Sequence, residues 1–258
     1  MKNELSVGAV QFRYDEDSKP YYNKINEIIE CVDLSVLDLI CFPELCVYGF
    51  DYRLMEELCD EEVNEQFRFF QDMADKNDLI VVAGLFEREG SENFDSVVVF
   101  DSEGEIVQKY KKTHLWGGER DFFTHGSTLK LFEADGWKIG VGICADLGFP
   151  ELSRKLALKG AEFIIYPSAW QSPYLKLWKQ MITARAAENQ AFVLGVNAVG
   201  SDNHYCGGTL LTNPKGDIVE ELKRDENFLS VKVDKQMVYD RREEIDWLSM
   251  VREDVYRH

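Results

Sequence analysis

The residues with the clearest chemical potential are one glutamate, one lysine and one cysteine, each placed at the end of a segment expected to be a strand. These are Glu44, Lys112 and Cys144. A thiol becomes a nucleophile when it loses its proton, and a carboxylate can accept that proton and return it to a leaving amine. A fixed ammonium can lower the pKa of the thiol and neutralise an oxyanion. The three residue types together predict acyl transfer through a thioester, which water activated by the same Glu44 then hydrolyses.

The segment around Cys144 predicts a strand that turns sharply into a helix. Residues 137–143 alternate between larger apolar residues and glycine, the period of an extended chain. Asp146 is expected to cap the following helix, with Pro150 in its first turn and Glu151 near the positive end of its dipole. Cys144 would then lie beside free backbone N–H groups, which favour a thiolate and an oxyanion.

Each of these residues also has a structural interpretation. A cysteine at the end of a buried strand is often a small core residue, although strand, turn and helix around a nucleophile is also an elbow geometry. Glu44 could be an acid at a helix start, and Lys111 and Lys112 could be a solvated charged pair. The glycines before Cys144 leave room for another backbone or for a substrate.

The elements that must position these residues alternate along the whole chain. Strands are expected at 5–12, 38–42, 79–86, 162–168, 191–197 and 228–233, and helices at 21–32, 61–77 and 175–190. Two hairpins are expected, at 94–110 around the turn 101–104 and at 206–222 around the turn 213–216. This pattern predicts an α/β fold in one domain over residues 1–258, with a core at about 4–233 and a polar tail from 234 to 258. Because the ends of strands gather at one rim of a sheet, Glu44, Lys112 and Cys144 are expected to lie together.

Composition excludes several classes of function. The chain has 258 residues and a net charge of −18, which argues against binding to nucleic acid or to anionic membranes. We expect no membrane span and no signal peptide, and therefore a cytoplasmic protein with free thiols. The histidines and cysteines lack the spacing of zinc ligands. Neither a metal nor another cofactor is predicted.

Several blocks of sequence resemble the carbon–nitrogen hydrolase (nitrilase-like) superfamily. They are Pro43-Glu44-Leu45 with Tyr48-Gly49, the run 110–115 around Lys112, and the run 142–150 around Cys144. Further blocks at 118–126, 167–170, 184–189, 197–200 and 207–216 resemble later signatures of the family. The similarity covers about residues 4–233 and is closest to the amidase-like branch.

This resemblance implies an α-β-β-α sandwich with Glu44, Lys112 and Cys144 as a catalytic triad. It implies that Glu119 is a further glutamate that positions the substrate or the lysine. It also implies a homodimer or a higher homo-oligomer, often paired through the helix at 175–190.

The departures from the family pattern concern the substrate. True nitrilases have Trp-Glu after the cysteine, whereas this chain has Ala145-Asp146, as on the amidase side. Many amidases of the group have tyrosine and arginine where this chain has Ala145 and Gly148. An arginine there could hold a carboxylate, so its absence argues against ω-amides of dicarboxylic acids. Tyr48, Trp116 and Trp170 could form the wall of an acyl pocket, or they could be core aromatics.

The sequence therefore predicts a cysteine-dependent hydrolase that releases ammonia and a carboxylate from a small linear amide. The expected substrate-binding residues are Tyr48, Trp116, Ala145 and Trp170. Alternatives with the same triad are an N-carbamoyl amine or amino-acid hydrolase and an ω-amidase. A decayed binding module of the same fold is the non-enzymatic alternative, although a relic would be free to lose one member of the triad.

Overall fold

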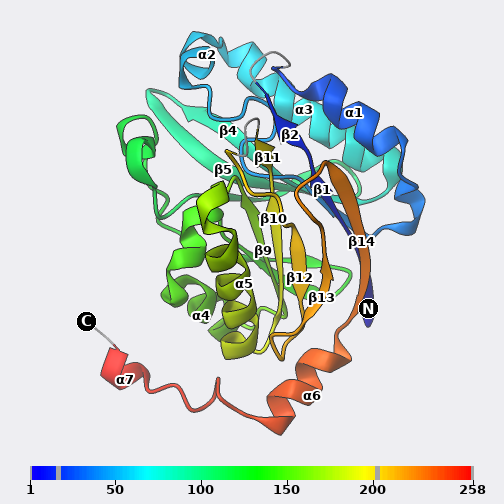
Figure 1. Ribbon diagram of the computed structural model, residues 1–258, viewed down its shortest axis with the longest axis vertical. Helices are drawn as coiled ribbons and strands as arrows, with labels where there is room; N and C mark the ends of the chain where they lie inside the picture. The colour runs from blue at the N-terminus through cyan, green and yellow to red at the C-terminus, as the bar shows by residue number, and fades with distance from the viewer. Residues whose placement is uncertain (1, 16–18, 201–203, 257–258) are drawn as a thin grey trace.

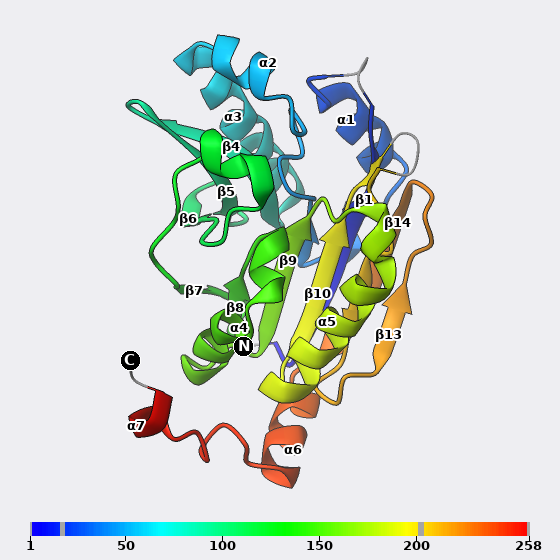
Figure 2. The same cartoon turned by 60° about the vertical axis from the view of Figure 1, so that its left-hand side comes forward.

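Two six-stranded sheets lie face to face in the computed structural model, which describes residues 2–15, 19–200 and 204–256 (Figures 1 and 2). The strand order is β14-β1-β3-β4-β5-β6 in the first sheet and β13-β12-β10-β9-β8-β7 in the second. Strand β1 contacts β10 and strand β4 contacts β9 across the interface. The predicted α-β-β-α sandwich is confirmed, with α1 and α3 outside the first sheet and α4 and α5 outside the second (Figures 1 and 2).

The strands of the first sheet are β1 (Glu4–Gln11), β3 (Leu39–Cys41), β4 (Ile80–Glu89), β5 (Glu92–Phe100), β6 (Ile106–Lys111) and β14 (Asn227–Asp234). Those of the second are β7 (Leu131–Ala134), β8 (Trp137–Val141), β9 (Phe163–Ser168), β10 (Phe192–Asn197), β12 (Leu210–Thr212) and β13 (Ile218–Glu221). The short strands β2 (Arg13–Tyr14) and β11 (Val199–Gly200) pair with each other in parallel. Strand β7 and the separate hairpin of β4 with β5 are additions to the elements expected from the sequence.

The α-helices are α1 (Tyr22–Glu30), α2 (Tyr52–Glu57), α3 (Asp60–Asn77), α4 (Pro150–Leu158), α5 (Leu175–Asn189), α6 (Gln236–Glu244) and α7 (Glu253–Tyr256). The 3₁₀ helices are η1 (Leu34–Val36), η2 (Gly117–Asp121), η3 (Cys144–Gly148) and η4 (Ser172–Tyr174). Helices α6 and α7 occupy the segment expected to be a polar tail, below the sandwich in Figure 1. The end of that tail, 257–258, lies outside the described residues. Among the described helices, none is both long enough and apolar enough to cross a membrane.

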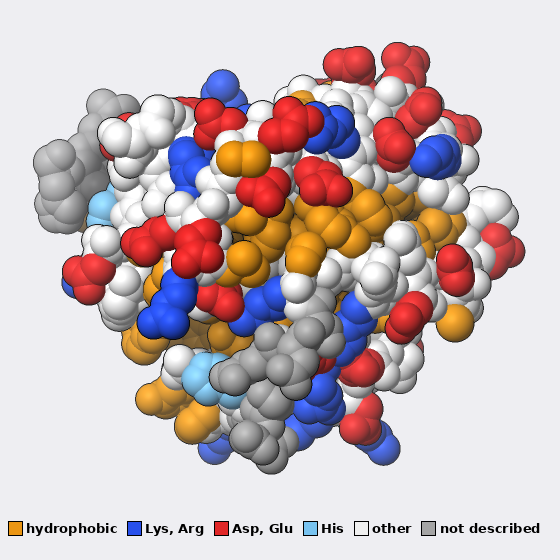
Figure 3. Space-filling view, turned by 90° about the horizontal axis from the view of Figure 1, so that it is seen from above, with side chains coloured by type: hydrophobic (Ala, Val, Ile, Leu, Met, Phe, Trp, Pro, Cys, Tyr) orange, Lys and Arg blue, Asp and Glu red, His pale blue; other side chains and the backbone are white. Residues whose placement is uncertain are grey.

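Side chains that point alternately to the two faces of each strand divide the core into two layers. In β4, Val82 packs between the sheets, whereas Val81 and Ala83 pack under the outer helices. In β5, Val97 belongs to the inner layer and Val98 to the outer one. Because side chains of a strand point alternately to its two faces, one strand contributes to both layers. The outer surface carries many Asp and Glu side chains, as the face in Figure 3 illustrates.

The helix after Cys144 begins later than the sequence indicated. Helix α4 starts at Pro150, with Phe149 at its N-cap and no side-chain cap. The expected cap by Asp146 is therefore wrong, because Asp146 lies within η3 and its carboxylate is used elsewhere. The expectation for Pro150 and Glu151 in the first turn is confirmed.

Candidate active site

Glu44 is held on the inner side of the first sheet by close backbone packing. It follows β3, and a Cβ on Gly84 of β4 would come within 2.5 Å of Glu44 Cα, so glycine is required for this approach. The hydroxyl of Tyr14 donates to the carbonyl oxygen of Glu44 at 2.5 Å. Leu45, the next residue, has a positive φ of 49°. The backbone therefore places the fully buried Glu44 side chain in a fixed direction.

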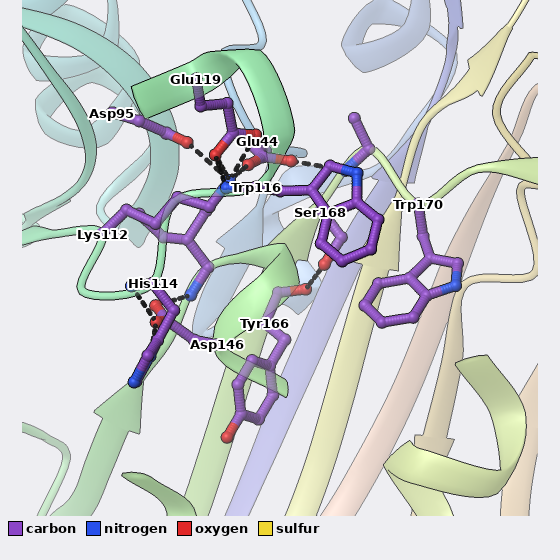
Figure 4. A network of polar contacts seen from close by, with 12 residues as sticks. Glu44, Asp95, Lys112, His114, Trp116, Glu119, Asp146, Tyr166, Ser168 and Trp170 are labelled. Carbon is purple, nitrogen blue, oxygen red and sulfur yellow. Dashed lines mark hydrogen bonds and ion pairs between the residues drawn. The ribbon is translucent and has the colours of Figure 1, made fainter. Parts of the chain in front are cut away.

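Lys112 lies at the centre of the site and makes contact with three carboxylates (Figure 4). Its Nζ donates to Glu44 Oε1 at 2.5 Å and to Glu119 Oε1 at 2.8 Å. Asp95 Oδ2 is 3.2 Å from the same Nζ. Lys112 is fully buried, so the interpretation of Lys111 and Lys112 as a solvated pair is wrong for Lys112.

The direction of each pKa shift follows from this burial. Burial lowers the pKa of Lys112, but attraction to Glu44 and Asp95 more than offsets this effect. The pKa of Lys112 is therefore well above its usual value, and the ammonium keeps its proton. Burial raises the pKa of Glu44, against the opposing effect of Lys112. Burial raises the pKa of Glu119 in the same way. A carboxylate with a raised pKa takes up a proton more readily, which suits it to act as a general base.

Lys112 also provides a positive charge at the centre of a cluster of three acids. The carboxylate oxygens of Glu44, Asp95 and Glu119 lie within 4.8 Å of one another, a spacing that could hold a cation. Lys112 Nζ is in ion-pair contact with all three, so an ammonium takes the position that a metal would need.

Cys144 begins η3 at the end of the second sheet, where the chain turns toward α4. Its φ of 41° is in the left-handed region, which costs a non-glycine residue about 1 to 3 kcal/mol. This strained strand-to-helix turn matches the expected elbow. The N–H of Ala169, just after β9, donates to Glu44 Oε2 at 2.8 Å and also interacts with the Cys144 thiol. The same backbone group therefore links the Glu44 carboxylate and the Cys144 thiol across the two sheets.

The environment of Cys144 does not favour a free thiolate, contrary to the expectation from the sequence. Burial raises the pKa of the thiol well above its usual range, and the carboxylates of Glu44 and Glu119 add to this effect. Lys112 and the Ala169 N–H oppose the rise but do not cancel it. The thiol is therefore neutral at rest, and it would need a base in order to act as a nucleophile.

The glycines before Cys144 serve packing rather than substrate access. A Cβ on Gly142 would come within 2.6 Å of the Tyr166 ring, and one on Gly140 within 2.9 Å of Leu156 in α4. The expectation that they leave room for a backbone or a substrate is therefore wrong, because side chains of the same chain fill these positions.

Glu119 supports both the lysine and the loop beside it. Its Oε1 accepts from Lys112, and its Oε2 accepts from the backbone N–H of Trp116 at 2.8 Å. These bonds start the 3₁₀ helix η2 and orient the Lys112 ammonium. The positioning role that the family resemblance implied for Glu119 agrees with these contacts, and we carry it forward as a proposal.

The aromatic residues expected around the acyl group separate into two sets. Tyr48 is buried in the outer layer, where its hydroxyl donates to the Glu62 carbonyl oxygen of α3 at 3.0 Å. Trp116 is 61% exposed and Trp170 is partly buried, and both indole rings lie on the same side of the lysine and carboxylate cluster in Figure 4. The contacts of Tyr48 favour its interpretation as a core aromatic, whereas Trp116 and Trp170 remain candidates for the pocket wall. Ala145 follows Cys144 directly and is partly exposed.

Asp146 joins the segment after Lys112 to the turn that carries Cys144. Its buried carboxylate accepts from the N–H groups of Ile143 and His114, both at 2.9 Å, and from the Tyr110 hydroxyl at 2.6 Å. The His114 ring nitrogen Nδ1 lies 2.7 Å from the Asp146 carboxylate (Figure 4). The same ring stacks on that of Phe149. One side chain therefore fixes the relative position of the two loops.

We expect Asp146→Ala to lower the free energy of unfolding by about 3 kcal/mol, because several buried donors lose a charged acceptor at once. Activity should fall further than the folded fraction does, since the turn at Cys144 loses its support. Urea unfolding and initial rates on the same samples would check this. The exposed carboxylate of Asp121 gives a matched control, and equal effects of Asp146→Ala and Asp121→Ala would contradict the prediction.

The sequence did not identify two groups of the site, the Asp95 side chain and the Ala169 N–H. Asp95 had a detectable signal, because it falls at an inward-facing position of a strand whose other inward residues, Val97 and Val99, are apolar. A backbone N–H leaves no signature in the residue types.

Comparison with known proteins identifies the family. The model of the carbon-nitrogen hydrolase family matches residues 6–243, so the chain belongs to this family, the nitrilase superfamily. It is similar to a 2-oxoglutaramate amidase of Bacillus subtilis, with 34% identity over 85% of this chain and 86% of the relative. It is also similar to an (R)-stereoselective amidase of a Pseudomonas species, with 32% identity over 87% of this chain and 82% of the relative. The fold matches an amidase of Nesterenkonia sp. AN1, whose structure was determined in complex with acrylamide. The TM-score is 0.88 at 20% identity, over 99% of this chain and 97% of the other.

Proposed function

We propose that the protein is an amidase that cleaves the C–N bond of a small linear amide through a thioester on Cys144. The observation that carries the proposal is the buried lysine held between Glu44 and Glu119, next to a cysteine in a left-handed turn. Carbon–nitrogen hydrolase membership and relatives named as amidases support the reaction class.

In the first half of the proposed reaction, Glu44 accepts the thiol proton as Cys144 Sγ attacks the amide carbonyl carbon. The C=O electrons move to oxygen, and the oxyanion is stabilised by Lys112 Nζ and the N–H of Ala145. Collapse of this intermediate breaks the C–N bond, and Glu44 returns the proton to the departing nitrogen. The products are ammonia and a thioester.

In the second half, Glu44 removes a proton from water as the water oxygen attacks the thioester carbon. The C–S bond then breaks, the proton returns to sulfur, and the carboxylic acid leaves. The raised pKa values of Glu44 and Cys144 support this cycle, because a neutral thiol and a base that can both take up and release a proton are needed at the start of each turnover.

A screen for ammonia release over aliphatic amides, ω-amides and carbamoyl compounds tests the proposal. Ammonia without carbon dioxide supports an amidase, whereas both products together support the N-carbamoyl alternative. Absence of hydrolysis in all three classes, with the folded protein at high concentration, would favour a decayed binding module.

The proposed acyl group is uncharged near the reacting carbon. Among the described residues that contact Glu44, Glu119 or Asp95 through side chains, Lys112 is the cation, and these three carboxylates already surround it. Lys111 pairs with Glu89 and lies over the Phe94 ring, and Arg120 donates to the Leu115 carbonyl oxygen. A substrate carboxylate would therefore find no unpaired lysine at the centre of the site.

An ω-amidase remains the second candidate, because the Bacillus subtilis relative is named for 2-oxoglutaramate, an amide that carries a carboxylate. Gly148 is exposed, and an added side chain would meet open space there. It offers no cation to replace the arginine of many relatives.

We expect a short neutral amide to be hydrolysed with a kcat/KM at least equal to that of a dicarboxylic monoamide of the same chain length. Steady-state kinetics on the two substrates check this. A preference of tenfold or more for the carboxylate, about 1.4 kcal/mol, would move the protein to the ω-amidase branch. Arg120→Gln and Lys111→Gln would then show which cation holds the carboxylate.

Two further expectations stay predictions. Tyr174 and Leu177 expose large apolar side chains next to or on α5, the helix through which the family resemblance implies pairing of two copies. The homodimer is therefore retained as a proposal, and the cytoplasmic location likewise.

A further inference from the structure

Asp95 is a buried acid on the inner face of the first sheet. It lies on β5 opposite Phe86 of β4 and is 1% exposed. Val97 and Val99, the next residues on the same face, pack between the sheets. The backbone carbonyl of Asp95 accepts from the Lys112 N–H at 2.8 Å, so its position is fixed relative to the lysine.

The carboxylate of Asp95 has fewer stabilising contacts than those of Glu44 and Glu119. Glu44 accepts hydrogen bonds from Lys112 and from the Ala169 N–H, and Glu119 accepts from Lys112 and from the Trp116 N–H. Neither oxygen of Asp95 accepts a hydrogen bond of good geometry from any described group, although Oδ2 is 3.2 Å from Lys112 Nζ. A buried anion without donors is costly.

Charge balance requires a proton somewhere in this cluster. Three carboxylates and one ammonium would leave two uncompensated negative charges in a site from which water is excluded. Carboxyl groups that face each other at such short range cannot all ionise, so one of them retains its proton. Asp95 is the acid whose ionised form is stabilised least by its neighbours.

We propose that Asp95 carries a proton in the resting protein and donates a hydrogen bond to the Glu44 carboxylate, which keeps Glu44 ionised and ready to act as the base. This inference rests on the proposed function. Asp95 is a positioning residue, because it acts on the reaction through Glu44 and keeps its own proton throughout the cycle. Burial raises the pKa of Asp95 well above its usual range, and the contact with Glu44 raises it further while lowering the pKa of Glu44.

The other groups that face this pair do not supply the missing proton. The contacts of Lys112 and Glu119 have been described, and the Cys144 thiol interacts with the Ala169 N–H, which also donates to Glu44 Oε2. Tyr52 of α2 faces the same cluster, and burial raises the pKa of its hydroxyl. Because the pKa values of Lys112, Cys144 and Tyr52 are raised, these three groups keep their own protons, and the acids of the cluster are the groups that respond to a pH change.

Two variants separate a neutral Asp95 from an ionised one. Asparagine has the same shape, is neutral and can donate to Glu44, whereas leucine has a similar volume and no donor. We expect Asp95→Asn to keep the acid limb of the pH profile of kcat/KM within about half a unit of the wild type. In Asp95→Leu, Glu44 loses a donor to its charged form, so its pKa rises and the limb moves about one to two units higher.

A movement of the Asp95→Asn limb to lower pH by one unit or more would overturn the proposal, because it would reveal the loss of a negative charge beside Glu44. An unchanged limb in Asp95→Leu would overturn it as well. Asp121→Asn, an exposed acid of η2, is the control and should leave the profile unchanged.

The rate of alkylation of Cys144 by iodoacetamide, followed by peptide mass spectrometry, also depends on pH. It therefore tests the protonation of the site without any amide substrate. If the wild type hydrolyses no amide, the proposed function fails while this measurement still tests Asp95. If amides are hydrolysed but the pH dependence of alkylation in the Asp95 variants differs from that expected, the proposal for Asp95 is wrong while the proposed function stands.

Unfolding provides a third readout. A folded-state pKa above the unfolded value of about 3.9 means that wild-type protein takes up a proton on folding, so its stability falls as pH rises above that value. Asp95→Asn has no such proton to take up. In urea unfolding, the stability of Asp95→Asn relative to wild type should therefore increase as the pH rises from about 4 toward the mildly alkaline range. A constant difference across this range would contradict a protonated Asp95.

Discussion

Cys144→Ala is expected to lower kcat on the best amide substrate by more than about a thousandfold while the protein stays folded. Loss of a nucleophile removes the covalent route altogether, and what remains is binding and oxyanion stabilisation. The substitution removes a single atom, and Cys144 as a whole residue is only partly buried, so the unfolding transition should move little. Ammonia release under saturating substrate, with circular dichroism of the same sample, measures both effects.

The cysteines elsewhere in the chain provide the control for this variant. Cys31 is exposed and lies at the end of α1, so Cys31→Ala should retain full activity. Residual activity of Cys144→Ala above about one thousandth of the wild type would exclude a covalent role for its sulfur.

Lys112→Met is expected to lower both stability and activity by large factors. Methionine has a similar length but no charge, so Glu44, Asp95 and Glu119 would lose their shared cation in a buried site. Removal of one partner from a buried ion pair costs about 3 to 5 kcal/mol. Loss of the oxyanion partner should lower kcat by about 10² to 10³.

The stability loss in Lys112→Met should depend on pH in a defined direction. Without the ammonium, the pKa values of the three buried acids rise further above their unfolded values. The folded variant then binds more protons than the unfolded chain. Its stability therefore decreases as the pH rises from the unfolded pKa values of these acids toward their folded values. Urea unfolding at acid and at mildly alkaline pH would measure the difference.

The neighbouring lysine is the matched control for Lys112. Lys111 is partly exposed and pairs with Glu89, a contact worth about 0 to 1 kcal/mol. Lys111→Met should therefore change neither stability nor kcat substantially. If the two variants lose stability equally, Lys112 does not hold the carboxylates together.

Much of this site could be predicted from the sequence because its residues follow strands. Glu44, Lys112 and Cys144 each come shortly after a strand, and parallel strands such as β3 and β4 bring such ends to one edge. The elements themselves were predictable for the same reason. Val63, Phe67 and Phe70 have helical spacing, and all three are buried on the inner face of α3.

The parts that sequence reasoning missed depend on contacts between distant segments. Aspartate is a common helix-capping residue, which is why Asp146 was expected to cap the next helix. Its carboxylate instead accepts hydrogen bonds from Tyr110 and His114, which the packing of the two sheets brings beside it. The pKa of Cys144 was expected to fall because of its place at a turn, whereas burial beside Glu44 decides the direction. The local sequence pattern predicts the secondary-structure element on which a side chain lies, but not the residues that surround it in the folded protein.

The division of the site between the two sheets has a consequence for the nascent chain. Glu44 and Lys112 follow strands of the first sheet, whereas Cys144 and Ala169 follow strands of the second. A ribosome that has released only the first half has produced the proposed base and cation without the proposed nucleophile. The Cys144 thiol meets its proposed proton acceptor only when the apolar faces of both sheets pack against each other. Under the proposed mechanism, completion of the core is therefore the folding step that assembles the reactive groups.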